Sequence, residues 1–446
     1  MNIPQKYKGK YFYHFTHIDN IPSIVAHKGL FSTNQKNAFG IGHHNVALMD
    51  IQNRRSEMEV PVGPGGVVHD YVPFYFASTN IMLLSLLNRK IVDQPYIVFM
   101  AIPIEKLSDA KVVFTDASAN TNIPPHFYDN PNDLDQLNWD LIDSTKWKTN
   151  SDSERHSRMA EVLVHEFVPL NWIDTYIVFN KIGENMIKDC YKNAGLQKPK
   201  ISYDWWNNRA FFFTKFFFGN RKNETLVTGP IQLQKFCQSV IESITKKRTR
   251  MNKNKCLFKN MHDAISKIDD DFCIIPELVG IYNLKTDNQV HHESVSDHTI
   301  TVVDNIPESR YYSLLNEKER VIVTLAAYFH DIGKGPKEKW NDGIQKAYAD
   351  HPLDSLLMLD RIFSEDFVKI KYDDYKDICI LVAYHDLLGD ILEKGRSMEE
   401  LNRLALSDRG LYMLAILSEA DIRAIGGLFA IGIDKKIYHL VNQIMG

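Results

Sequence analysis

The chain has 446 residues, a formal net charge of −4 and five cysteines. This length predicts two or three domains, and the charge excludes a general attraction to nucleic acid or anionic membrane, so either would need a local basic patch. The cysteines are scattered without a Cys-x-x-Cys pair, which argues against a disulfide framework or structural zinc and favours a reducing compartment. The N-terminus lacks the apolar core of a signal peptide and the longest apolar run is too short to span a bilayer, so we expect a cytoplasmic protein without membrane contact.

The first half opens with a predicted strand followed by a helix. In the stretch YFYHFT, His14 and Thr16 fall on the same face, which is strand spacing. Residues 18–30 have the pattern of a helix, which we expect to end at Gly29. The glycine-rich stretch 60–76 is not a dinucleotide fingerprint, because its glycines are out of register for G-x-G-x-x-G and a strand-like aromatic run follows.

A polar, proline-bearing stretch, residues 116–155, separates these elements from a second strand. Loops of this length are usually functional or disordered. In the strand AEVLVHEFVPL, Glu161 begins the apolar run and shares a face with His165. A carboxylate at the start of a buried strand is a candidate site residue, although a glutamate on a solvated edge strand would give the same pattern.

Three blocks of this half resemble the DarT-type DNA ADP-ribosyltransferases, in the family's order. They are HFTHIDNIPSIVAHKGL, RRSEMEVPVGPGGVVHDYVPFYF and RMAEVLVHEFVP, and the later ISYDWWNNRAFFF resembles the family's last strand. The resemblance implies that residues 1–215 form an ADP-ribosyltransferase domain with a split β core, which uses NAD to modify a base in single-stranded DNA. It also implies a toxin or anti-phage effector with an antitoxin protein as partner, and a substrate-recognising role for the loop 116–155.

The resemblance also assigns residues to NAD. His14 and Thr16 match the family's His-x-Thr pair, which we expect to contact the nicotinamide amide. Tyr75, in the second block, is a further expected NAD-binding residue. One of Arg54 and Arg55 matches the family's catalytic arginine, which also reaches the cofactor, and we prefer Arg55.

Glu161 matches the family's catalytic glutamate, and the chemistry suits a carboxylate. Breaking the nicotinamide–ribose bond passes through an oxocarbenium-like state, the electronic problem that glycosidases solve with carboxylates. A glutamate near that ribose can stabilise the developing positive charge or take a proton from the nucleophile. An arginine offers a planar fork that suits either the pyrophosphate or the glutamate itself.

Residues 216–255 are a predicted linker that begins with aromatic residues and ends in the basic run KKRTRMNKNK. Such a run is typical of a solvated linker. It would also suit contact with a phosphate backbone, with the upstream aromatic residues stacking on bases. We take this segment as the domain boundary.

From residue 256 onward, apolar residues recur with a period of 3.6, which predicts an all-helical domain over residues 256–446. In VIVTLAAYFHDIGK, a buried helix ends at His330 and Asp331, and an adjacent imidazole and carboxylate can ligate one divalent cation. A solvated helix end would explain this His-Asp pair equally well. Whether the pair binds metal therefore depends on whether the chain offers further ligands. Further candidate ligands stand in or beside other apolar helical runs: His298, His351, His385 and Asp421.

This order, H…HD…H…H…D, resembles the HD phosphohydrolase superfamily, and the segment that leads to His298 resembles the start of the HD domain of CCA-adding enzymes. The resemblance implies hydrolysis of phosphate esters by a divalent metal, for which imidazole and carboxylate ligands suit Mn, Fe, Co, Ni or Zn. Lys334, one turn after the pair, is a candidate catalytic residue for holding a phosphate oxygen. His291 and His292 match an upstream histidine of the family loosely. The expected metal ligands are His298, His330, Asp331 and Asp421, with His351 and His385 for a second metal.

The predicted fold class is α+β: an ADP-ribosyltransferase-like split β core with helices, followed by an all-α HD domain. Two functions compete. In the first, the chain ADP-ribosylates DNA, and the HD domain edits nucleotides or reverses the modification. In the second, it repairs RNA ends, transferring a 2′-phosphate to NAD and trimming phosphates. A binding module with decayed sites is disfavoured, because every expected residue type is present.

Overall fold

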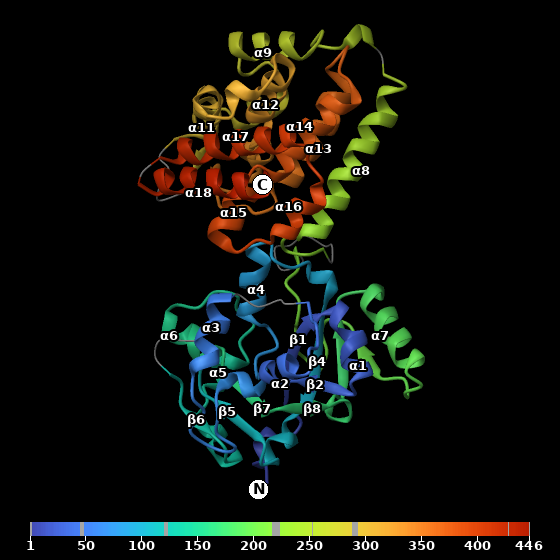
Figure 1. Cartoon of the computed structure of the whole chain (residues 1–446), viewed down its shortest axis with the longest axis vertical. Helices are drawn as coiled ribbons and strands as arrows, with labels where there is room; N and C mark the ends of the chain where they lie inside the picture. Colours follow the sequence, from blue (N-terminus) through green and yellow to red (C-terminus); the bar gives the residue numbers. More distant parts are fainter. Residues whose placement is uncertain are drawn as a thin grey trace. The chain divides into compact units, whose positions relative to one another are not determined.

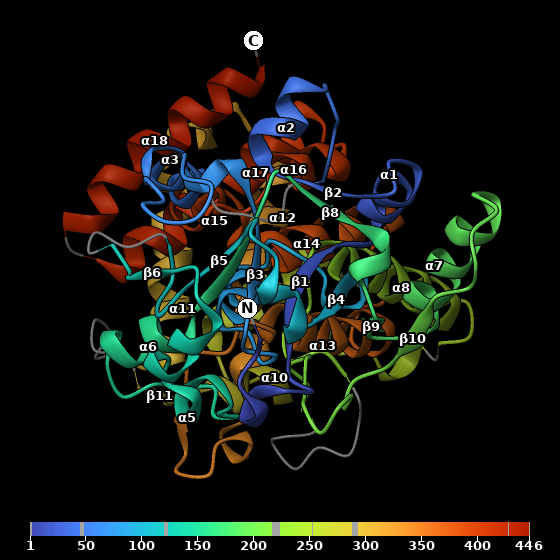
Figure 2. The same cartoon turned by 90° about the horizontal axis from the view of Figure 1, so that it is seen from below.

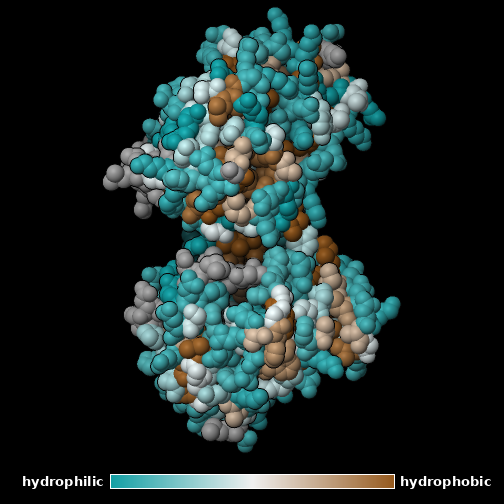
Figure 3. Space-filling view, viewed as in Figure 1, coloured by the Kyte–Doolittle hydropathy of each residue, from teal (hydrophilic) through white to brown (hydrophobic). Residues whose placement is uncertain are grey.

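The computed structural model describes residues 2–44, 49–119, 124–215, 224–251, 253–287, 293–426 and 428–445. The chain forms two compact units (Figure 1): the first is Met1–Asn88 with Val92–Leu226, and the second is Val227–Gly446 with the short segment Arg89–Ile91. No helix among the described residues is long and apolar enough to cross a membrane. The visible surface of each unit is mostly hydrophilic (Figure 3).

The first unit is built on a mixed sheet. Among the described residues, eight strands lie in the order β10-β9-β4-β1-β3-β7-β5-β6 (Figure 2), and neighbouring strands are antiparallel except β9 and β10. A separate antiparallel pair joins β2 and β8. The strands are β1 (Tyr11–His17), β2 (Gly29–Phe31), β3 (Tyr71–Tyr75), β4 (Ile97–Pro103), β5 (Val112–Thr115), β6 (Phe127–Tyr128), β7 (Glu161–His165), β8 (Phe167–Pro169), β9 (Thr175–Val178) and β10 (Lys200–Ser202).

The sheet opens between β1 and β3. Strand β1 pairs with β4 along its whole length, but its register with β3 is confined to Tyr13 opposite Tyr75. Pro73 lies in the middle of β3 and has no N–H to donate, so the ladder cannot continue past it on both sides. The split of the predicted β core therefore falls at this proline.

Short helices surround the sheet, and its core is dense with alternating aliphatic and aromatic residues such as Phe12, Phe74 and Val162. The stretch predicted as a long loop, residues 116–155, contains β6, a short 3₁₀ helix, α5 and the start of α6 among its described residues. The helices of this unit are α1 (Ile21–Ala26), α2 (Thr33–Ala38), α3 (Met49–Glu57), α4 (Ile81–Asn88), α5 (Trp139–Ile142), α6 (Asp152–Arg158) and α7 (Lys181–Asn193).

The first predicted helix ends earlier than expected. Helix α1 stops at Ala26, Lys28 takes the left-handed conformation with φ of 59°, and Gly29 opens β2. A Cβ on Gly29 would lie 2.3 Å from the carbonyl oxygen of Val168. Glycine is therefore required here by the close approach of β8, and not as a helix stop.

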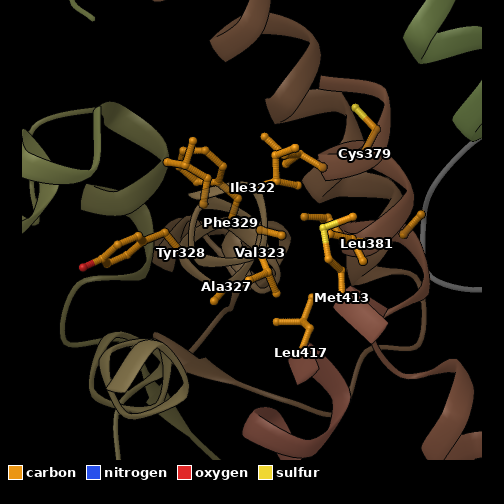
Figure 4. Close-up of a cluster of buried hydrophobic side chains, with 14 of the residues drawn as sticks. Ile322, Val323, Ala327, Tyr328, Phe329, Cys379, Leu381, Met413 and Leu417 are labelled. Carbon is orange, nitrogen blue, oxygen red and sulfur yellow. The ribbon is translucent and has the colours of Figure 1, made fainter. Parts of the chain in front are cut away.

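The second unit is helical, as predicted, apart from the two-residue strands β11 (Lys285–Thr286) and β12 (Ile344–Gln345). Its central helix is α12 (Glu317–Phe329). This helix buries residues such as Val323 and Phe329 against Leu381 of α14 (Tyr372–Tyr384) and against Met413 and Leu417 of α17 (Asp408–Ile425), as Figure 4 shows. The helices are α8 (Pro230–Arg248), α9 (Met261–Asp270), α10 (Pro276–Ile281), α11 (Val295–Asn305), α12 (Glu317–Phe329), α13 (His351–Glu365), α14 (Tyr372–Tyr384), α15 (Leu387–Lys394), α16 (Met398–Leu404), α17 (Asp408–Ile425) and α18 (Leu428–Met445), with the 3₁₀ turn η12 (Ile332–Lys334).

The structure differs from the predicted linker, because much of residues 216–255 is helix α8. Its buried positions, including Leu233, Cys237, Val240 and Ile244, recur at helical spacing and pack in the core of the second unit. The basic end of α8 is also engaged: Arg248 donates to the carbonyl oxygens of Phe363 and Phe367, near the C-terminus of α13. The unit boundary lies at Leu226, and residues 216–223 and 252 fall outside the described residues.

Candidate active site and metal centre

A cavity of the first unit lies at the split between β1 and β3. It is lined on one side by His14 and Thr16 of β1 and on the other by Tyr71 and Pro73 of β3. The Nδ1 atom of His14 lies 2.8 Å from the carbonyl oxygen of Pro73, which can only accept, so Nδ1 carries the proton and Nε2 keeps its lone pair. Burial lowers the pKa of His14 to about 4, although this hydrogen bond opposes the shift. The imidazole is therefore neutral at physiological pH.

Asn20, which the sequence analysis did not single out, connects Thr16 with His44, another residue of the cavity lining. Its side-chain amide donates to Thr16 Oγ1 at 2.8 Å and to the carbonyl oxygen of His44 at 2.9 Å. It also accepts from the backbone N–H of His44 at 2.7 Å. Thr16 is thereby fixed at the cavity wall while its hydroxyl proton remains available to a ligand.

The structure pairs Arg55 with Glu161. Nη1 and Nη2 of Arg55 donate to Oε1 and Oε2 of Glu161 at 3.0 and 2.9 Å, and Arg55 also lines the cavity. Ser118 Oγ and the backbone N–H of Ala119 donate to Oε1 at 3.1 and 3.2 Å. Glu161 is fully buried (0% exposed) at the start of β7, so this is an inward-facing carboxylate and not a solvated edge residue. Four donors hold it in a single orientation.

Two other residues were predicted for this site, Tyr75 and Arg54. Tyr75 stands opposite Glu161 in the pairing of β3 with β7, and burial together with the Glu161 carboxylate raises the pKa of its hydroxyl. It belongs to the surroundings of the ion pair, because neither Tyr75 nor Glu161 is among the described residues that line the cavity. Arg54 is exposed on α3 and takes no part in the pair.

A second cluster of potential ligands, His17, Asp19 and His44, lies beside this cavity. The rings of His17 and His44 stack at 3.9 Å with an interplanar angle of 12°. Nitrogen lone pairs lie in the plane of each ring, so two stacked imidazoles cannot aim them at the same ion. We assign no metal to this group.

In the second unit, three histidines are oriented by the same kind of backbone hydrogen bond. Nδ1 of His330, His351 and His385 each donates to the carbonyl oxygen three residues earlier, at 2.7, 2.8 and 2.8 Å. Each ring is therefore held in the tautomer that leaves the Nε2 lone pair available, which is how metal-binding histidines are oriented. His330 and His385 follow directly after the last residues of α12 and α14, and His351 is the first residue of α13.

Asp331 lies between two groups of ligands. Its Oδ2 is 3.3 Å from Nε2 of His330 and 3.7 Å from Nε2 of His298, and its Oδ1 is 3.3 Å from Nε2 of His351. Asp421 completes the first group, because its Oδ1 is 2.8 Å from Nε2 of His298. The ligand atoms within each group lie within 4.8 Å of one another: His298, His330 and Asp421, and Asp331, His351 and His385.

These residues fit divalent metal. Nε2 of His330 and Oδ1 of Asp331 are buried, and neither has a hydrogen-bond partner among the described residues. Buried polar atoms left in this way are costly unless an ion binds them. Burial would lower the pKa of His330, but the carboxylates of Asp331 and Asp421 outweigh it and raise that pKa to about 9. A site that draws a proton this strongly also attracts a metal cation.

Two further residues belong to this centre. The ammonium group of Lys334 pairs with Oδ2 of Asp331 from the next turn, as its predicted position suggests. Asp386, which the sequence analysis missed, brings its carboxylate within 3.6 Å of Nε2 of His385 and 3.9 Å of Nε2 of His351. The signal was present in the sequence, because His385 and Asp386 repeat the His-Asp pair at the end of an apolar helix. His291 and His292 lie outside the described residues.

Comparison with known proteins assigns both units. Residues 13–213 match the family model described as ssDNA thymidine ADP-ribosyltransferase, DarT. A DNA ADP-ribosyl transferase of Thermus sp. (strain 2.9) is 30% identical over 203 residues, which are 44% of this chain and 94% of that protein. The chain belongs to the DarT family. Residues 295–423 match the HD domain, a range that includes all six predicted metal ligands. The predicted architecture of a DarT domain followed by an HD domain is thus confirmed.

Two further comparisons also report similar proteins. A DNA ADP-ribosyl transferase of Thermus aquaticus is 32% identical over 174 residues, covering 38% of this chain and 75% of that protein. A solved structure, described as Thermus sp. 2.9 DarT in complex with ADP-ribosylated ssDNA, is 27% identical, covers 46% of this chain and 96% of that chain, and gives a TM-score of 0.41.

Proposed function

We propose that the DarT unit transfers ADP-ribose from NAD to a thymidine base in single-stranded DNA. The observation that carries this proposal is the bidentate pair of Arg55, which lines the cavity in the sheet split, with the buried Glu161 behind it. The relatives named DNA ADP-ribosyl transferase support DNA as the acceptor, and the family description supports thymidine.

Each side chain of the site has a chemical task in this reaction. His14, neutral and with an available Nε2 lone pair, accepts a hydrogen bond from the nicotinamide end of NAD, where Thr16 can donate one. Glu161 stabilises the positive charge that develops on the ribose and takes the proton of the incoming base. Arg55 fixes the carboxylate in one orientation, so that it needs no reorganisation when the bond breaks.

We further propose that the HD unit hydrolyses a phosphate ester. Histidine and carboxylate side chains suit Mn, Fe, Co, Ni or Zn, with Asp331 between the two groups of ligands. When bound, a divalent metal supplies Lewis acidity to this hydrolysis. Lys334 holds a phosphate oxygen through its ammonium group, which Asp331 keeps in place.

A DNA-modifying activity of this kind suits a toxin or anti-phage effector in the cytoplasm, where DNA and NAD are both present, with an antitoxin protein to restrain it. Expression in a bacterium tests this role. The wild-type chain should halt growth, and a chain with an inactive DarT site should not. Equal growth of the two strains would contradict a toxic role.

The acceptor is tested by incubating the whole chain with NAD labelled in the adenylate and with a matched set of acceptors. We expect label on a thymidine-containing single strand, and little on duplex DNA or on a single strand in which every thymidine is replaced by deoxycytidine. Label confined to RNA, or the appearance of ADP-ribose 1″,2″-cyclic phosphate from RNA that carries a 2′-phosphate, would support RNA-end repair instead and overturn the proposal.

A further inference from the structure

The lining of the DarT cavity is of mixed character. Its apolar residues include Ile24, Leu30, Phe31 and Ile41, which suit a nucleoside. Among the described residues that line it, the fixed positive charges are those of Lys36 and Arg55. A dinucleotide bound here brings two negative charges in its pyrophosphate. We therefore compare Lys36 and Arg55 as the side chain that balances this charge.

Arg55 is already committed. Both of its terminal nitrogens donate to the carboxylate of Glu161, and the side chain is buried against it (6% exposed). Turning the guanidinium toward a pyrophosphate would leave the carboxylate buried without its counter-charge, which is expensive in a protein interior. The same arginine therefore cannot serve Glu161 and the phosphates at low cost.

Lys36 is in the opposite situation. It lies on α2 and lines the cavity, partly buried, and burial lowers the pKa of its ammonium group. No carboxylate among the described residues raises that pKa, and none of them forms an ion pair or a side-chain hydrogen bond with Lys36 Nζ. Its positive charge also lowers the pKa values of His14, His43 and His69, three other residues of the cavity wall. The field of Lys36 therefore extends across the cavity.

We propose that Lys36 is the pyrophosphate-binding residue of the DarT cavity and that it recognises the diphosphate of NAD. The inference rests on the proposed function, whose nucleotide substrate supplies the anion. A partly desolvated ammonium group without a carboxylate partner gains most from an anionic ligand, since the attraction is weakly screened there. The division of labour follows: Lys36 holds the diphosphate and Arg55 stays with Glu161.

The test compares Lys36→Met with the whole wild-type chain. Calorimetric titrations use ADP, adenosine and inorganic phosphate as probes, and initial rates are measured against NAD concentration. We expect the Kd for ADP to rise roughly tenfold or more, and the Kd for adenosine to change less than about twofold. The KM for NAD should rise by a similar factor, with kcat nearly unchanged. Lys36→Arg should recover most of the affinity for ADP, because it restores the charge.

Controls separate the charge from other effects. Lys192→Met removes an exposed lysine from the last turn of α7 and should leave both titrations unchanged. An ADP affinity in folded Lys36→Met equal to that of wild type, or an equal loss for ADP and adenosine, would overturn the inference. Tight binding of inorganic phosphate alone would show a simple anion site and would also overturn it.

The two proposals fail separately. If the wild-type chain binds ADP through Lys36 but transfers nothing to DNA, the proposed function fails and the role of Lys36 stands. If it transfers ADP-ribose with the same KM after Lys36→Met, the role of Lys36 fails and the proposed function stands.

Discussion

Arg55 and Glu161 form a buried bidentate ion pair in the DarT unit, with N–O distances of 3.0 and 2.9 Å. The pair changes how the glutamate should be tested. Glu161→Ala would leave the Arg55 charge buried and unpaired, and the removal of one partner of a buried pair typically costs about 3–5 kcal/mol. Loss of activity in that variant would thus be mixed with loss of stability. Glu161→Gln also removes the counter-charge of Arg55, but it keeps the shape and one hydrogen-bond acceptor, so it should be destabilised less than Glu161→Ala and is the better test of activity.

His14 makes the stability of the DarT unit depend on pH. Its pKa is lowered to about 4 in the folded state, mainly by burial, from an ordinary value near 6.5. Between these values the unfolded chain binds a proton that the folded chain does not, so the free energy of unfolding falls as the pH drops from about 6.5 toward 4. Urea unfolding across this range should show a smaller fall for His14→Gln than for wild type. The exposed His262→Gln should follow wild type, and parallel curves for wild type and His14→Gln would contradict the prediction.

The basic end of α8 should matter for stability rather than for DNA binding. Arg248 donates to carbonyl oxygens of Phe363 and Phe367 near the C-terminal end of α13. A positive charge there also interacts favourably with the negative end of the helix dipole. We expect Arg248→Met to lower the free energy of unfolding by about 1–3 kcal/mol, and the exposed Arg250→Met to lower it by much less. If Arg248→Met instead unfolded like wild type but reduced the salt dependence of DNA binding, the basic end of α8 would contact DNA phosphates.

Asp331 should control metal binding by the HD unit. The whole chain, purified and dialysed, should retain divalent transition metal, and a chelator should lower its Tm, since an ion bound to the folded state stabilises it. Asp331→Asn should lose most of the metal and most of the hydrolysis of phosphate esters, while ADP-ribose transfer by the DarT unit continues. The matched control is Asp304→Asn, an exposed aspartate of α11. A wild-type chain with no metal and no change of Tm with chelator would contradict the metal centre.

Much of this arrangement was predictable because the signal is local. An apolar helical run that ends in His330 and Asp331, or in His385, indicates polar groups held at the edge of a core. The structure places these residues in two groups of potential metal ligands, with Asp331 between them. Asp386 was missed although the same reasoning applies to it. Strand alternation placed Glu161 at the start of an apolar strand, and the resemblance to the DarT-type family singled it out as catalytic.

Other features depend on contacts that are distant in sequence. The buried positions of α8 were hidden among lysines and polar residues, so the helix was interpreted as a linker. The partner of Arg55 is 106 residues away, and the sequence left open whether that arginine meets a phosphate or a carboxylate. Lys36 has no local signal, because its cavity is formed by β1, β3 and the segment that contains His43 and His44.

The most direct test of the account is the rate of ADP-ribose transfer to a thymidine-containing single strand by the whole chain carrying Glu161→Gln, compared with Glu166→Gln. Glu166 is an exposed glutamate just after β7 and is the matched control. Loss of a carboxylate that acts on the reacting atoms should lower the rate roughly 10²–10⁴-fold under conditions in which circular dichroism shows the variant to be folded, and Glu166→Gln should keep the wild-type rate. A folded Glu161→Gln chain that transfers ADP-ribose at the wild-type rate would contradict the assignment of the catalytic site.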